Sequence, residues 1–221
     1  MGTPVRPRFL MERTLLQAGY RGVVGVDEAG RGPLFGPVVA AAVLLPAGFD
    51  PRCLAGVTDS KRLGAPRRQR LAELITQQAQ VGWGLATAAE IDAVNIRQAT
   101  FLAMTRALEC LSGAPGFCFS PAFDGCFALV DGRDVPPGWS LPARALVRGD
   151  GKSLAVAAAS IIAKTRRDDL VERLAERYPG YGLERHKGYP TAEHQRALRA
   201  LGPTPEHRRT FAPVRALGAG G

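Results

Sequence analysis

The feature that most constrains the fold of this chain is an apolar run that ends in two adjacent carboxylates and a glycine-rich turn. The run is Val23-Val24-Gly25-Val26, and the acids are Asp27 and Glu28. Successive side chains of a strand point to opposite faces, so one carboxylate must face the covered side unless the strand bends. A buried carboxylate is costly without a hydrogen bond, a cation or a metal. The run therefore predicts a buried strand with a functional acid pair, and an ordinary acidic turn is the alternative.

The turn after the acids places Arg31 between Gly30 and Gly32. Glycine adopts conformations that other residues avoid, so the backbone N–H groups of this turn can face a polar ligand. The turn is not a dinucleotide fingerprint, because position 35, where its third glycine would fall, is Phe. Because its backbone N–H groups can face a ligand, we expect Gly30, Arg31 and Gly32 to bind substrate.

Two later apolar segments also end in an acid beside glycine. Residues 126–130 run into Asp131, and residues 143–147 lead to Asp150. Each Asp alone is also typical of a turn, but three repeats favour one carboxylate cluster at the ends of strands. No histidine or cysteine stands at metal-ligand spacing beside these acids, and an all-oxygen site suits magnesium or manganese.

The composition and net charge of the chain indicate what kind of partner it binds and in which compartment it works. The 221 residues are 46% apolar and carry a net charge of +9, which fits a globular protein that binds an anion such as nucleic acid, or one that is merely basic. The four cysteines form no Cys-x-x-Cys pair, which is typical of a reducing compartment. We expect a cytoplasmic location and no membrane partner, because the chain has neither a leader pattern nor a long apolar run.

Hydrophobic spacing gives a coarse set of elements. It predicts strands over 23–26, 37–45, 81–88, 126–130 and 143–147, of which the first two form a hairpin. It predicts helices over 8–19, 66–79, 89–111 with a break near Asn95, 154–178 and 191–201. Loops are expected over 58–63 and 113–125, and a frayed tail over 215–221.

Basic residues occur on the long fourth helix and in the segment after it. Ser160, Lys164, Arg167 and Asp168 fall on one side of the helix, either as a solvated stripe or as a contact for phosphates. Basic and aromatic residues then mix over 181–213, a pattern that suits contact with sugars and phosphates of nucleic acid.

Several motifs in a fixed order resemble those of bacterial ribonuclease HII, a type 2 ribonuclease H. They are Gly25–Pro33, Asp59-Ser60-Lys61-Arg62-Leu63, Val130-Asp131-Gly132, Arg148-Gly149-Asp150, Ala158–Lys164, His186–Thr191 and His207–Pro213. In the second motif an arginine replaces a family lysine, and Arg133 stands where the family often has asparagine. The resemblance covers residues from about 20 to 214.

The resemblance implies an α/β fold of the ribonuclease H type, with a mixed five-stranded sheet flanked by helices and a helical C-terminal extension. We expect a single domain over 1–221, with a core over about 20–178 and a substrate-binding part over about 179–214. We also expect a monomer.

The resemblance further implies a metal-dependent endonuclease. It would hydrolyse the RNA strand of RNA–DNA hybrids and cut at single ribonucleotides embedded in duplex DNA, leaving a 5′-phosphate and a 3′-hydroxyl. By similarity, the catalytic and metal-binding residues are Asp27, Glu28, Asp131 and Asp150, which would hold two divalent cations, Mg²⁺ or Mn²⁺. Clustered carboxylates repel one another and take up protons unless cations neutralise them.

The expected substrate-binding residues are Gly30, Arg31, Gly32, Lys61, Lys164 and Tyr189. Tyr189 matches a family tyrosine that stacks on a sugar and hydrogen-bonds the 2′-hydroxyl; the alternative is that it packs the C-terminal part against the core. Two other functions stay open. One is a different metal nuclease or integrase of this fold, which would be distinguished from a ribonuclease H by its substrate choice on defined duplexes. The other is a non-catalytic hybrid-binding protein, which a turnover assay with magnesium would distinguish from an enzyme.

Overall fold

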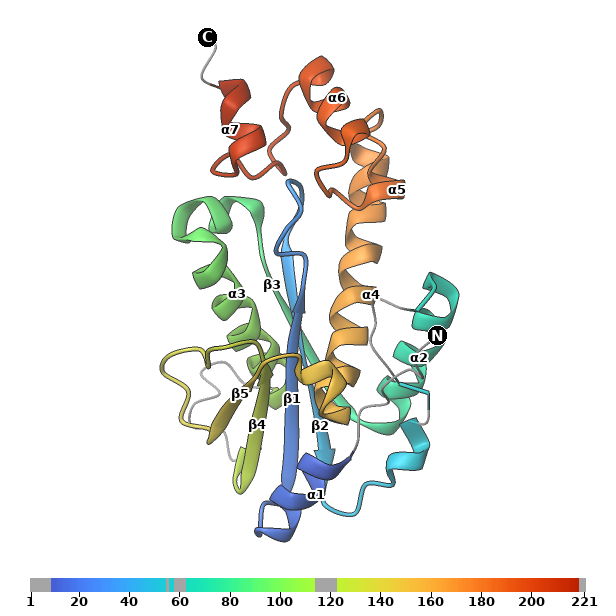
Figure 1. The fold of residues 1–221 in the computed structure, drawn as a ribbon, viewed down its shortest axis with the longest axis vertical. Coiled ribbons are helices and arrows are strands. Elements are labelled where there is room, and N and C mark those ends of the chain that lie inside the picture. The colour runs from blue at the N-terminus through green and yellow to red at the C-terminus, as the bar shows by residue number, and fades with distance from the viewer. Residues whose placement is uncertain (1–8, 55, 58–62, 114–122, 219–221) are drawn as a thin grey trace.

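The computed structural model describes residues 9–54, 56–57, 63–113 and 123–218. Its centre is one five-stranded sheet with the strand order β3-β2-β1-β4-β5 (Figure 1). The strands are β1 (Gly22–Ala29), β2 (Val38–Pro46), β3 (Gln80–Ala86), β4 (Cys126–Asp131) and β5 (Ala143–Leu146). The five strands expected from the sequence are all present.

The sheet is mixed, as expected. β1 and β2 pair as the predicted antiparallel hairpin, and β3 extends it antiparallel to β2. β4 pairs parallel to β1, and β5 pairs parallel to β4. Because β1, β4 and β5 run in one direction, their carboxyl ends meet at the same edge of the sheet, where sites of α/β proteins usually form.

Helices cover both faces of this sheet. The described helices are α1 (Leu10–Gln17), α2 (Ala65–Gln78), α3 (Ala88–Ser112), α4 (Leu154–Arg177), α5 (Leu183–His186), α6 (Ala192–Leu201) and α7 (Ala212–Gly218), with short 3₁₀ turns η1 (Pro51–Leu54) and η5 (Gly149–Gly151). Of these, α2 and α4 pack on one face of the sheet and α3 packs on the other. α3 begins with a capping box between Thr87 and Glu90, and the predicted break at Asn95 is confirmed by its φ of 70°.

Alternation along β1 divides the core into two layers. Val23 belongs to the cluster packed under α4 and α2, whereas Val24 and Val26 belong to the cluster packed under α3. α4 comes so close to β1 that a Cβ atom on Gly25 would lie 2.0 Å from the backbone carbon of Ala155. Glycine is therefore required at position 25, and α4 is seated directly on the strand that carries the acid pair.

A third apolar cluster lies where α4 extends beyond the sheet toward α5, α6 and α7 (Figure 1). Leu34 and Phe35, which follow the glycine-rich turn, are buried in it. The tail expected to fray from residue 215 is instead helical as far as 218, because Val214 is buried in this cluster and anchors α7.

Two expected loops fall largely outside the described residues, namely 58–63 except Leu63 and the stretch 114–122 of the loop after α3. Among the described residues, no helix is both long and apolar enough to span a membrane.

Candidate active site

Asp27 and Glu28 lie inside β1 rather than after it. β1 continues to Ala29, and the pair faces Ala41 and Ala40 of β2 across the hairpin. The expectation that the strand ends at Val26 was wrong, because pairing with β2 carries the backbone past the end of the apolar run. The two side chains do point to opposite faces, as the sequence predicts: Asp27 is 5% exposed on the α4 side.

Asp131 lies next to Asp27 because of the parallel register. The β1–β4 ladder ends at the pair Val26–Val130, so the two aspartates follow at the same level of neighbouring strands. The Asp131 carboxylate accepts a hydrogen bond from the backbone N–H of Gly149 at 2.6 Å. The turn after β5 therefore fixes the orientation of an acid at the end of β4.

The electrostatics show how closely these acids are grouped. Burial raises the pKa of Asp27 well above its ordinary value, and the negative charges of Glu28 and Asp131 raise it further. Hydrogen bonds from the Ser160 side chain and from the Glu28 backbone N–H, the latter at 2.7 Å, act in the opposite direction. A cation beside these oxygens would relieve the repulsion.

Asp150 is not at a strand end. It lies four residues beyond Leu146, in η5, and its carboxylate accepts from the N–H of Gly151 at 2.9 Å. Its neighbour Gly149 is the residue that donates to Asp131, so η5 stands against Asp131.

A buried glutamate fixes the segment between η5 and α4. Glu12 of α1 accepts from the Ser153 hydroxyl at 2.6 Å and from the Ala155 N–H at 3.0 Å. Ser153 in turn caps the first turn of α4. Sequence reasoning missed this contact, because 141 residues separate Glu12 from Ser153.

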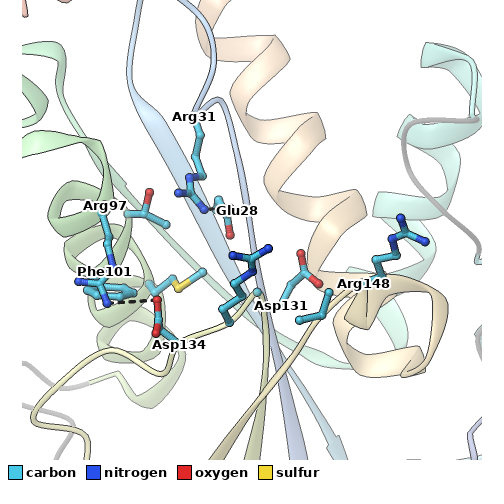
Figure 2. Close-up of a pocket in the computed structure, with 12 residues that line it drawn as sticks. Glu28, Arg31, Arg97, Phe101, Asp131, Asp134 and Arg148 are labelled. Carbon is cyan, nitrogen blue, oxygen red and sulfur yellow. Dashed lines mark hydrogen bonds and ion pairs between the residues drawn. The ribbon is translucent and has the colours of Figure 1, made fainter. Parts of the chain in front are cut away.

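A cleft of about 420 Å³ opens on the α3 side of the acids, and we call it the arginine cleft (Figure 2). It is lined by Glu28, Arg31, Arg97, Thr100, Phe101, Met104, Asp131, Gly132, Arg133, Asp134, Val147 and Arg148. Arg31 donates to Glu28 at 3.3 Å, and Arg97 pairs with Asp134 at 3.1 Å while its guanidinium lies over the Phe101 ring. Four arginines thus surround two of the acids.

Sequence reasoning missed three of these arginines as binding residues. Arg133 was visible only as a departure from the family pattern, and Arg148 only as part of a motif. Arg97 follows the kink at Asn95, whose side chain accepts from the Arg97 N–H at 3.0 Å. The kink was predicted, but the direction in which it points the Arg97 side chain depends on the tertiary structure.

A second cavity of about 250 Å³ lies on the α4 side, and we call it the narrow pocket. Its lining is Glu28, Ala29, Gly30, Arg31, Gly32, Ser160, Lys164 and Tyr189. Five of the six expected substrate-binding residues therefore surround one cavity, which shares Glu28 and Arg31 with the arginine cleft. The sixth, Lys61, lies outside the described residues.

The polar residues of α4 are neither a solvated stripe nor a simple phosphate contact. Ser160, Arg167 and Asp168 are buried. Lys164 donates to Asp168 at 2.6 Å, and Arg68 of α2 donates to the same carboxylate at 2.7 Å. Burial lowers the pKa of Lys164. Of this row, Ser160 and Lys164 line the narrow pocket, whereas Arg167 and Asp168 do not.

The basic and aromatic residues after α4 divide into two groups. His194 and His207 are buried, with their Nε2 atoms 3.2 Å apart, and His186 stacks on His194. Tyr189, by contrast, is 42% exposed and faces the narrow pocket. His194 Nδ1 lies 3.0 Å from the carbonyl oxygen of Tyr189, so the buried histidines support the backbone that presents the Tyr189 ring.

Comparisons with known proteins agree with this geometry. A family model described as Ribonuclease HII matches residues 24–214. Ribonuclease HII of Halorhodospira halophila is 57% identical over 201 residues, covering 90% of this chain and 96% of that protein. Ribonuclease HII of Ruegeria pomeroyi is 49% identical over 209 residues, covering 95% and 84%. The crystal structure of ribonuclease H2 from Pyrococcus horikoshii OT3 matches with a TM-score of 0.71 at 28% identity, covering 90% and 97%. This chain belongs to the ribonuclease HII family, whose members cleave RNA in RNA–DNA hybrids.

Proposed function

We propose that this ribonuclease H cuts at single ribonucleotides embedded in duplex DNA as well as in RNA–DNA hybrids, with two divalent cations held by Asp27, Glu28, Asp131 and Asp150. The observation that carries the proposal is the buried Asp27 carboxylate, whose pKa is raised by burial and by the charges of Glu28 and Asp131. Such a group either takes up a proton or binds a cation.

The donor set fits a hard cation. The carboxylates supply oxygen, which Mg²⁺ and Mn²⁺ prefer. Within the described residues, no three His, Cys, Asp or Glu side chains form a complete metal cage. Mg²⁺ is usually held by one or two carboxylates together with water and substrate phosphates. We therefore infer that the substrate's own phosphate completes the coordination.

The protein's part in the chemistry is to hold its oxygens in fixed positions. When bound, the cations would activate the attacking water and stabilise the leaving 3′ oxygen. Glu28 N–H and Ser160 orient Asp27, and Gly149 N–H orients Asp131. The hydrolysis would leave a 5′-phosphate and a 3′-hydroxyl.

The two cavities divide the substrate between them. The narrow pocket offers the main chain of Gly30–Gly32 and the exposed Tyr189 ring, which suits a ribose whose 2′-hydroxyl both donates and accepts. The arginine cleft offers guanidinium groups, which suit phosphates of the duplex. A strand that crosses the acids would contact both, because Glu28 and Arg31 line both cavities.

The test is a cleavage assay on three duplexes of one sequence. One strand is all DNA, or DNA with a single ribonucleotide, or all RNA. With Mg²⁺ or Mn²⁺ we expect cutting of the second and third duplexes, with 3′-hydroxyl ends, and no cutting of the first or in EDTA. Cutting of the all-RNA strand alone would overturn the single-ribonucleotide assignment, and cutting in EDTA would overturn the metal assignment.

A further inference from the structure

Two fully buried arginines hold the backbone of the narrow pocket. Arg208, in the segment before α7, donates to the carbonyl of Gly30 at 2.6 Å, of Arg31 at 2.9 Å and of Gly36 at 2.9 Å. Two of these three carbonyls belong to the glycine-rich turn. The guanidinium fork of Arg208 therefore fixes how this turn is directed.

Arg167 of α4 joins the residues that follow this turn to the segment that carries Tyr189. It donates to the carbonyls of Phe35 at 3.2 Å, Pro37 at 3.3 Å and Lys187 at 3.1 Å. Its side chain also lies against Gly30, where a Cβ atom would stand 2.0 Å from Nε. Gly30 has a φ of +95°, so both the space and the conformation require glycine.

The Tyr189 side of the pocket is tied to the turn by the backbone as well. The N–H of Leu34 donates to the carbonyl of Gly188 at 2.8 Å, and the N–H of Arg208 donates to the carbonyl of Leu34 at 2.9 Å. A Cβ atom on Gly32 would meet the Tyr189 ring at 3.6 Å. The two walls of the pocket are thus held at a fixed separation by Arg167, Arg208 and these bonds.

Buried, charged side chains are an unusual means of holding a backbone turn in place. In the described part of the chain, every hydrogen bond of the two guanidinium groups ends on a backbone carbonyl, and Nη1 of Arg167 has no partner. Burial lowers the pKa of both groups, and the charge of Arg167 helps to lower that of Arg208 to about 9. Apolar residues would fill the same volume without this desolvation cost.

We propose that Arg167 and Arg208 are positioning residues that set the selectivity of the narrow pocket for a single ribose. They act through the backbone of Gly30–Gly32 and through the turn before Tyr189, and they do not touch the substrate. This proposal rests on the proposed cutting at a lone ribonucleotide. At a lone ribonucleotide, one pocket must recognise one sugar, whereas an all-RNA strand offers a ribose at every neighbouring position.

The test uses Arg208→Lys and Arg167→Lys, which keep a basic side chain of similar length and lose the planar fork that reaches several carbonyls. We expect kcat/KM on the single-ribonucleotide duplex to fall about tenfold more than on the RNA–DNA hybrid, since about 1.4 kcal/mol of positioning equals a factor of ten. Arg208→Gln keeps two amide donors without a buried charge, and it replaces Arg208→Lys if that variant does not fold.

Arg106→Lys is the matched control. Arg106 is a half-buried arginine that also donates to a backbone carbonyl, that of Leu85, and to Glu90, but it does not line either cavity. We expect it to lower the melting temperature without changing the ratio of the two activities.

The outcomes separate the two proposals. If the wild-type protein fails to cut the single-ribonucleotide duplex, the proposed function and the role of the arginines both fail. If the wild-type protein cuts it, but the arginine variants lose both activities equally or match the Arg106→Lys ratio, only the positioning role is overturned.

Discussion

The narrow pocket and the arginine cleft share two residues but are built in opposite ways. One wall of the narrow pocket is the backbone turn Gly30–Gly32, and buried arginines hold that turn in place. The walls of the arginine cleft are long side chains, and its Arg97–Asp134 pair is about half exposed on both partners. Exposed pairs contribute little to stability and exchange readily with other partners.

The difference suggests a division of labour across one acid cluster. Phosphate contacts give affinity without regard to sequence, and flexible arginines can follow any duplex. Recognition of one hydroxyl group needs donors and acceptors at fixed positions, and a rigid backbone supplies these. Affinity and selectivity are therefore expected to respond to different substitutions.

The largest effect should come from the acids, which serve both regions. Asp131→Asn keeps the shape of the side chain and removes a charge from the cluster, so we expect turnover to fall by about 10³-fold or more on every substrate. Duplex binding and folding should remain, as measured by fluorescence anisotropy and circular dichroism. Near wild-type turnover at saturating Mg²⁺ would show that Asp131 holds no metal.

Tyr189 should separate the two regions, because it lines only the narrow pocket. Tyr189→Phe removes a hydroxyl worth about 1 kcal/mol, so cutting at a lone ribonucleotide should fall by roughly fivefold and cutting of a hybrid should fall less. Tyr189→Ala also removes stacking and should impair both substrates by about tenfold or more. Equal losses on both substrates for the Phe variant would rule out a role in reading the hydroxyl.

Much of the fold and the position of the site was visible in the sequence, because local patterns carry both, whereas the division into two cavities was not. Period-2 and period-3.6 spacing predicted the strands and long helices, and the acid pair with Gly30–Gly32 marked the site. Even the break at Asn95 was predicted. Each of these features depends on residues close together in the chain.

The missed features depend on distant residues. Glu12 reaches Ser153, and Arg208 reaches Gly30 across 178 positions. No spacing rule connects such pairs, and charged residues are expected outside rather than buried. The tail was misjudged for the same reason, since Val214 is anchored by a cluster that also contains Leu34.

The arginines that line only the arginine cleft should control affinity alone. Arg97→Ala and Arg133→Ala should each weaken binding to all duplexes several-fold and reduce the slope of log affinity against log salt by about 1, the value for one phosphate contact. The ratio of the two cleavage activities should stay unchanged. Arg52→Ala is the control, because Arg52 lies on η1 and lines neither cavity. A changed ratio for Arg97→Ala or Arg133→Ala would contradict the division of labour.

The smallest effect is that of low pH, which should destabilise the histidine cluster that supports the narrow pocket. The pKa of His207 is lowered from 6.5 to about 4 by burial, by His194 and by Arg209. The unfolded chain therefore binds a proton as pH falls through 6.5, whereas the folded chain does not until about pH 4. The contribution of neutral His207 to the free energy of unfolding is therefore complete above pH 6.5 and is lost progressively as the pH falls toward 4. The loss between pH 7.5 and 5.5 is about 1 kcal/mol.

His207→Asn isolates this contribution, because it keeps an acceptor near the position where Nδ1 receives the Thr204 N–H at 3.0 Å. The variant should be less stable at pH 7.5, yet its urea midpoint should fall less than that of the wild type on going to pH 5.5. Salt-dependent binding in the arginine cleft should not follow this pH change, since no histidine lines it. An equal fall of the midpoint in both proteins would show that His207 already carries a proton in the folded chain.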